Sequence, residues 1–195
     1  MKPRLKGRSF LLRLADDFVI GCELEEDAHR IMSVLPKRFG KYDLTIHPEK
    51  TKIVKFKRPP NRSKTAKDNG TFDFLGFTHY WSKSRKGNWV IKRKTAGKRK
   101  RRAMKRIWAW CKENRHKPIE EQYKTICSKL RGHYNYYGIR GNIRNISDIH
   151  YHLKITWKYW LKRRSQRNQL TWGKFMEKLT KAGFILPLPK LIHNI

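Results

Sequence analysis

The sequence predicts an α+β protein in which a small antiparallel sheet with one helix precedes an all-α bundle. Two observations indicate this class. Before Thr95, short apolar runs flank turn residues at the spacing of β-hairpins. After Thr95, apolar side chains recur at the spacing of helices. We therefore expect two domains, residues 1–94 and residues 95–195.

The first hairpin is predicted around an acidic turn. The apolar runs 10–12 and 18–20 flank the adjacent residues Asp16 and Asp17. A solvated β-turn is the simplest interpretation of such a pair, because aspartate tolerates turn geometry. Two adjacent carboxylates also repel each other, and a bound divalent cation relieves this repulsion. Asp16 and Asp17 are therefore candidate metal ligands.

The segment after this hairpin predicts one helix and further extended chain. Residues 1–9 are basic and are expected to form a frayed entry to the first strand. Acidic residues gather at the start of the segment 23–39, which favours a helix amino terminus, and Pro36 is expected to limit or end that helix. Residues 44–46 and 53–56 are then expected to be extended, and the strand 53–56 is expected to form one sheet with the two hairpins.

A second hairpin is predicted where aromatic residues cluster. Residues 71–81 are expected to pair with residues 89–92 across a polar turn. Gly76 lies between large aromatic residues, where a missing side chain lets another backbone come close. Four apolar series at helical spacing follow, beginning near Ala103, Tyr123, Ile149 and Trp172. These series predict a small helical bundle.

The charge balance points to an anionic partner. The chain has 48 Lys and Arg residues against 15 Asp and Glu residues, a net charge of +33. Nucleic acid is the obvious partner, because each neutralised phosphate releases counterions. No acid lies between Asp73 and Glu113, while basic residues accumulate there. The candidate phosphate-binding residues are Lys92, Arg93, Lys98, Arg99, Lys100, Arg101, Arg102, Arg131 and Arg140.

Hydropathy and cysteine spacing argue against a membrane-spanning, secreted or zinc-binding protein. No apolar run is long enough to span a membrane, and the basic start does not continue as a signal peptide. The three cysteines are far apart and are interpreted as reduced thiols, and no Cys/His cluster predicts a zinc domain. These features favour a soluble, intracellular protein, and the family resemblance given below implies the bacterial cytoplasm, with an organelle matrix as the alternative.

Several motifs together resemble one family. The segment from Arg13 to Ile20, with sequence RLADDFVI, resembles the Tyr-Ala-Asp-Asp motif of reverse transcriptases encoded by group II introns, with Leu14 in place of the tyrosine. The sequences PEKT at 48–51 and FDFLGF at 72–77 resemble later palm motifs of that family. Residues 130–142 resemble its thumb, which is called the maturase or X domain. The resemblance extends in order from Arg8 to the end.

The resemblance implies roles for individual residues. Asp16 and Asp17 would be catalytic palm carboxylates that bind Mg²⁺ in a two-metal phosphoryl transfer. Lys50 would contact the incoming triphosphate or its pyrophosphate, although a solvated loop lysine is an equal alternative. The primer grip would be Phe74, Leu75 and Gly76. Residues 1–94 would be the carboxy-terminal part of a palm and residues 95–195 the maturase-type thumb, with intron RNA and an RNA template with its DNA primer as partners.

One part of the family's metal site is not recognised in this sequence. The other metal aspartate of the family lies upstream of the hairpin, whereas Asp16 is the first acid here. The two-metal site is thus expected to be incomplete and the chain inactive as a polymerase alone. A separate polypeptide that supplies fingers and early palm would complete it, or the gene is a fragment. The alternative function is a non-catalytic RNA-binding maturase module that assists intron splicing.

Overall fold

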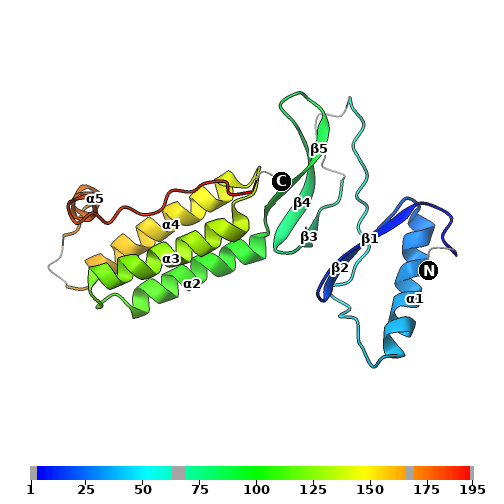
Figure 1. The fold of residues 1–195 in the computed structure, drawn as a ribbon, viewed down its shortest axis with the longest axis horizontal. Helices are drawn as coiled ribbons and strands as arrows, with labels where there is room; N and C mark the ends of the chain where they lie inside the picture. The colour runs from blue at the N-terminus through cyan, green and yellow to red at the C-terminus, as the bar shows by residue number, and fades with distance from the viewer. Residues whose placement is uncertain (1–3, 63–68, 166–168, 194–195) are drawn as a thin grey trace. The chain divides into compact units, whose positions relative to one another are not determined.

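A computed structural model describes residues 4–62, 69–165 and 169–193, and it has the α+β class that the sequence predicts. Two compact units make up the chain, and each is described by itself. The first unit contains residues 1–75 and 79–91, and the second contains residues 76–78 and 92–195. Figure 1 shows strands and one helix in the amino-terminal part of the chain, and helices in the remainder.

The predicted acidic hairpin is formed by β1 (Ser9–Leu14) and β2 (Asp17–Cys22). The two strands pair in an antiparallel register that runs from Ser9 opposite Cys22 to Leu14 opposite Asp17. Ala15 and Asp16 form the connecting turn, and Ala15 has a positive φ of 51°. This hairpin is a two-stranded sheet of its own.

Helix α1 (Glu25–Gly40) runs through Pro36, so the prediction that this proline ends the helix was wrong. Proline removes one backbone donor, but the apolar face continues on both sides of it. Ile31 and Leu35 are buried before it. After it, the ring of Phe39 stacks on Phe18 of β2, with centroids 6.1 Å apart. Packing against the hairpin therefore holds the last turn of the helix.

Residues 6–8, in the segment 1–9 that was expected to be frayed, are held by acids near the start of α1, whereas residues 1–3 lie outside the described residues. Buried Asp27 accepts hydrogen bonds from the backbone N–H groups of Lys6 (3.3 Å) and Gly7 (2.8 Å). The backbone N–H of Arg8 donates to Glu23 at 3.1 Å. The acids near the start of α1 thus accept hydrogen bonds from the backbone of the preceding segment. From the sequence, only an interaction with the helix dipole was expected of these acids.

The aromatic residues form a three-stranded sheet in the order β3 (Phe72–Phe74), β4 (Phe77–Lys83), β5 (Trp89–Thr95). The prediction of one strand over residues 71–81 was therefore wrong, because a turn at Leu75 and Gly76 divides it. The expectation of one sheet was wrong, and residues 53–56 and 44–46 form no strand. Side chains hold the first of these segments instead of a backbone ladder. The ring of Phe56 lies 5.0 Å from Phe72 and 5.5 Å from Trp81.

Four helices in the second unit confirm the predicted helical region. They are α2 (Gly97–Glu113), α3 (Ile119–Tyr137), α4 (Ile143–Lys162) and α5 (Trp172–Lys181). Their apolar stripes meet in one core, as the 3.6-residue period requires. No helix in the described ranges is long and apolar enough to cross a membrane. The most deeply buried apolar side chains of this core are Ile126, Leu130, Tyr134, Ile146, Leu153, Trp157 and Phe175.

Buried polar side chains fix how these helices join. Asn142 is fully buried between α3 and α4; its side chain accepts from the backbone N–H of Thr95 and donates to the Tyr137 carbonyl, both at 2.8 Å. The indole N–H of Trp157 donates to Gln122 at 2.8 Å. After α5 the chain returns along α4 (Figure 1), and the N–H of Ile192 donates to the carbonyl of Gly138 at 2.7 Å.

Candidate nucleic-acid interface and acidic turn

The acidic turn presents both aspartates to solvent. Asp16 closes the turn and Asp17 begins β2, and both side chains are exposed. The guanidinium of Arg13 donates to the carbonyl of Ala15 at 2.9 Å, which stabilises the turn beside the carboxylates. Leu14, at the position of the family tyrosine, is also exposed. The hairpin therefore exposes two carboxylates at consecutive positions of the chain.

These carboxylates do not form a two-metal site with the other described residues. Nowhere in the described ranges do three or more His, Cys, Asp or Glu side chains come together in a group that could hold a metal ion. Mg²⁺ prefers six oxygen ligands in near-octahedral geometry, and two ions need bridging carboxylates from neighbouring strands. Asp16 and Asp17 fit as part of such a site, but further ligands are required.

The strand that carries the turn is apolar on its accessible surface. The side chains of Phe10, Leu11, Leu12 and Leu14 are each more than half exposed. Within the described residues β1 pairs with β2 alone, so its other edge presents unpaired backbone groups. An exposed apolar edge of this kind is a template for another strand.

Lys50 lies at an exposed turn. Its backbone N–H and that of Thr51 donate to the carbonyl of His47, at 3.2 and 3.1 Å. The side chain is free to reach an anion, as is that of any exposed lysine. Its role at a triphosphate stays a prediction.

The turn between β3 and β4 has an unusual backbone. Leu75 and Gly76 have positive φ angles of 50° and 78°, the pattern of a type I′ turn, which glycine accepts and leucine rarely does. The chain holds this turn with its own groups, because the N–H of Ala96 donates to the Gly76 carbonyl at 2.9 Å. Strain at such a position is often kept at functional sites.

The close neighbour of Gly76 is a side chain of the protein itself. A Cβ on Gly76 would lie 3.2 Å from the hydroxyl of Tyr137 in α3. Phe77 stacks on Tyr136, with centroids 5.8 Å apart, and also contacts Tyr137. A side chain at the predicted primer-grip residue Gly76 is therefore disfavoured both by its backbone conformation and by its packing against α3. Contact of Phe74, Leu75 and Gly76 with a primer stays a prediction.

Four of the five basic residues in the first turns of α2 form no ion pair within the described part of the chain. Lys98, Arg99, Arg101 and Arg102 are exposed, and no acid lies in the first turn. The amino end of a helix carries a positive partial charge, so cations there are unfavourable unless an anion binds. Residue Ala96 also gives the helix no side-chain cap. This end of α2 is an electrostatic surface suited to phosphates.

The remaining predicted basic residues differ in their surroundings. Lys100 is half-buried, and its ammonium contacts Asp148 at 2.5 Å and Asn145 at 3.2 Å, so it ties α2 to α4. Arg131 in α3 and Arg140 in the turn before α4 are exposed. Lys92 and Arg93 are half-buried in β5. Of the predicted set, the exposed members on α2, with Arg131 and Arg140, are the accessible cations.

A second basic cluster, at the carboxyl ends of α2 and α4, was missed by sequence reasoning. It contains Lys112, Arg115, Lys162 and Arg163 around aromatic rings. The sequence feature that could have indicated this cluster is the repeated occurrence of aromatic residues beside basic residues in two distant segments. Only the fold shows that these segments meet.

Comparison with known proteins finds a family match for one part of the chain. Residues 2–79 match the family described as reverse transcriptase (RNA-dependent DNA polymerase). The matched segment contains the acidic turn, α1 and the turn at Gly76, whereas the helices α2 to α5 lie outside it. No curated protein matches the chain. The match supports a reverse transcriptase segment in the amino-terminal part of the chain.

Proposed function

We propose that this chain is the RNA-binding, carboxy-terminal part of a reverse transcriptase of the group II intron type, with palm motifs in residues 1–94 and a maturase-type thumb in residues 95–195. The observation that carries the proposal is the set of four exposed cations at the amino end of α2, which form no ion pair among the described residues, in a chain whose residues 2–79 match reverse transcriptases. Intron RNA and a template–primer duplex are the partners. The motifs quoted from residues 130–142 support the intron type.

The proposed polymerase chemistry requires more than these residues. Asp16 and Asp17 would supply two carboxylates to the Mg²⁺ site, and polypeptide outside this sequence would supply the rest. The exposed apolar edge of β1 is a suitable surface for that polypeptide. On its own, the chain would bind RNA without extending a primer.

A non-catalytic maturase module is the second candidate function. It is favoured by the contrast between an acidic turn that lacks further metal ligands among the described residues and a helical unit with a continuous core. In that case Asp16 and Asp17 would have no effect on splicing assistance. Both candidates require RNA binding through α2, so binding is tested first.

The binding test removes the four exposed cations of α2. A variant with Lys98, Arg99, Arg101 and Arg102 replaced by Gln is compared with the wild-type chain on a structured intron RNA over a range of salt concentrations. On a duplex, the slope of log affinity against log salt is expected to fall by about 0.9 for each lost phosphate contact, up to about 3.6. Lys100 is kept, because its ion pair with Asp148 stabilises the bundle.

The control removes the same charge elsewhere. Lys37, Arg38, Lys174 and Lys178 are exposed on α1 and α5, and their replacement by Gln lowers the net charge equally. This control is expected to keep most of the wild-type slope. An equal loss of slope in both variants would show diffuse attraction by net charge, and an unchanged slope in the α2 variant would exclude α2 as the interface.

A further inference from the structure

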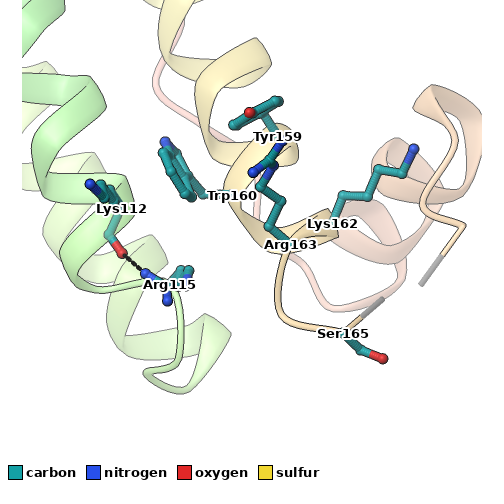
Figure 2. Close-up of a pocket in the computed structure, with 7 residues that line it drawn as sticks. All are labelled: Lys112, Arg115, Tyr159, Trp160, Lys162, Arg163 and Ser165. Atoms are coloured by element: carbon teal, nitrogen blue, oxygen red, sulfur yellow. Dashed lines mark hydrogen bonds between the residues drawn. The ribbon is translucent and has the colours of Figure 1, made fainter. Parts of the chain in front are cut away.

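We propose that the hollow at the carboxyl ends of α2 and α4 binds one unpaired nucleotide of single-stranded RNA. This inference rests on the proposed RNA-binding function and assigns it a second, separate site. The hollow has a volume of about 720 Å³, which lies within the usual range of ligand sites. Figure 2 shows Lys112 and Arg115 on one side of it, and Tyr159, Trp160 and Arg163 on the other.

The lining of the hollow is cationic without any acid. Four lining residues carry a positive charge, and none of the lining residues is acidic. None of these four cations has a carboxylate partner among the residues that the structure describes. Because like charges around one hollow repel one another, a bound phosphate would stabilise the arrangement. The four cations are Lys112, Arg115, Lys162 and Arg163.

Aromatic rings hold two of the guanidinium groups in place without neutralising them. The guanidinium of Arg163 lies 4.8 Å from the ring centre of Tyr159, and that of Arg115 lies 5.8 Å from Trp160. Arg115 also donates to the carbonyl of Lys112 at 2.9 Å (Figure 2). These contacts order both groups before a ligand arrives, which lowers the entropic cost of binding.

The same cluster provides flat surfaces for a base. Unpaired bases stack on aromatic rings and on guanidinium planes. Trp108 is 41% exposed, and its ring lies 5.0 Å from Tyr159 and 5.3 Å from Trp160. Arg163 covers Tyr159, so its outer face extends the stack. Cations for a phosphate beside planes for a base are the chemistry of a nucleotide.

An unused hydrogen-bond donor supports a ligand at this place. Trp160 lines the hollow and is 91% buried. Its indole N–H is also buried and has no hydrogen-bond partner within the described part of the chain. Buried donors normally have partners, since an unmet donor is destabilising. An acceptor on a ligand, such as a phosphate or base oxygen, would relieve this cost if the Trp160 ring turned to expose its N–H.

The hollow is distinct from the basic amino end of α2. Lys98 and Lys112 are 14 residues apart on one helix, which corresponds to about 21 Å at 1.5 Å per residue. Substitutions at one end therefore leave the other end intact. A concave site also suits a splayed nucleotide better than a duplex, whose phosphates follow a convex path.

The test uses the full chain and a 12-nucleotide oligouridine with one central 2-aminopurine, whose fluorescence falls when it stacks. Lys112 and Arg163 are replaced together by Gln. The slope of log affinity against log salt is expected to fall by about 1.4, since each phosphate contact on a single strand contributes about 0.7. The quenching of 2-aminopurine on binding is expected to be lost.

Two further variants separate charge from stacking. Replacing Lys174 and Lys178 of α5 by Gln removes the same charge outside the hollow, and slope and quenching should stay as in the wild-type chain. Arg163→Lys keeps the charge but removes the planar group. It should keep the slope and lose most of the quenching. Arg163→Lys with full quenching would overturn the stacking role.

The outcomes distinguish this inference from the proposed function. If the α2 variant loses RNA affinity while the Lys112 and Arg163 variant binds oligouridine with the wild-type slope and quenching, the hollow is not a nucleotide site and the proposed function stands. If the Lys112 and Arg163 variant loses duplex and single-strand affinity equally, the hollow adds only diffuse charge and the inference is wrong. If the wild-type chain binds no RNA, both fail.

Discussion

Gly76 shows how one residue connects a motif to the fold. It has φ of 78° and faces the Tyr137 hydroxyl, so a side chain there is disfavoured both by the backbone and by a neighbour. Gly87 has a similar φ of 79° but has no atom within 4 Å of the position of a Cβ. The two glycines therefore form a matched pair that separates backbone strain from crowding.

Substitution at these glycines should have unequal effects. Gly87→Ala is expected to destabilise the protein by about 1 kcal/mol through strain alone. Gly76→Ala should cost about 1 kcal/mol more, and Tyr137→Phe in the same chain should restore part of the difference because the crowding hydroxyl is gone. Urea denaturation measures each free energy of unfolding. Equal losses for the two glycines would contradict the packing of the turn on α3.

His150 makes the helical unit sensitive to acid. Burial lowers the pKa of this imidazole, with help from the charge of Lys154, while a hydrogen bond with the backbone of Pro187 opposes the shift. Its Nδ1 lies 2.9 Å from the hydroxyl of Tyr134. Burial also lowers the pKa of His133 in α3. The folded state therefore favours neutral imidazoles at both positions.

The sign of the resulting pH dependence follows from linkage. Below about pH 6.5 the unfolded chain binds protons that the folded chain does not, so the free energy of unfolding should fall as the pH falls towards the lowered pKa values. His150→Gln should reduce this slope between pH 5 and 7, measured by urea denaturation at several pH values. Replacement of exposed His116 by Gln is the control. An unchanged slope in His150→Gln would contradict the assignment.

Among the helices, α2 has an unfavourable charge distribution, because its cations lie at the end where the helix dipole is positive. Its first turn is basic and it lacks a side-chain cap, although an acid there would stabilise the helix. We expect the basic first turn of α2 to contribute to RNA binding and to lower the stability of the helix. α5 has the opposite arrangement, with Lys178 and Lys181 in its last turn, where cations are favourable.

Charge reversal at α2 should separate stability from binding. Lys98→Glu is expected to raise the free energy of unfolding by about 0.5–1 kcal/mol and to weaken RNA affinity several-fold at low salt. Lys178→Glu, at the other kind of helix end, should lower stability slightly and have little effect on affinity. Denaturation and RNA titration of both variants are the measurements. A Lys98→Glu chain that is both less stable and equally tight in binding would contradict the role of α2.

The helices and strands could be predicted from the sequence where a local pattern determines them. They were predicted less well where contacts between distant residues determine them. The acidic hairpin, the aromatic hairpin and the helices follow from alternation and helical period. Pro36 lies inside a helix because Phe39 packs on Phe18, and residues 53–56 are held by aromatic contacts instead of a ladder. Such contacts join distant parts of the chain, which a local pattern does not encode.

The candidate sites divide in the same way. The exposure of Lys98 and its neighbours follows from an acid-free run, but the use of Lys100 in an ion pair depends on Asp148, 48 residues away. The hollow near Arg163 depends on two helix ends that meet only in the fold. Charge composition therefore predicts the chemical class of the partner, whereas the residues that would contact the partner can be named only once the fold is known.

For the molecule as a whole, we propose that the acidic turn is part of a metal site that polypeptide outside these 195 residues completes. Two exposed carboxylates, an apolar open edge on β1 and the match to reverse transcriptases at residues 2–79 support it. Nothing in this claim requires the chain to act alone. It requires Asp16 and Asp17 to become essential once the site is whole.

Primer extension on an RNA template in Mg²⁺ tests this claim most directly. The chain is assayed alone and with a separately expressed polypeptide that carries the fingers and early palm of a group II intron reverse transcriptase. We predict no nucleotide incorporation by the chain alone, and incorporation with the added polypeptide that is lost in Asp16→Ala but kept when Glu113, an exposed acid outside the quoted motifs, is replaced by Ala. Incorporation by the purified chain alone, or complemented activity that survives Asp16→Ala, would contradict the account.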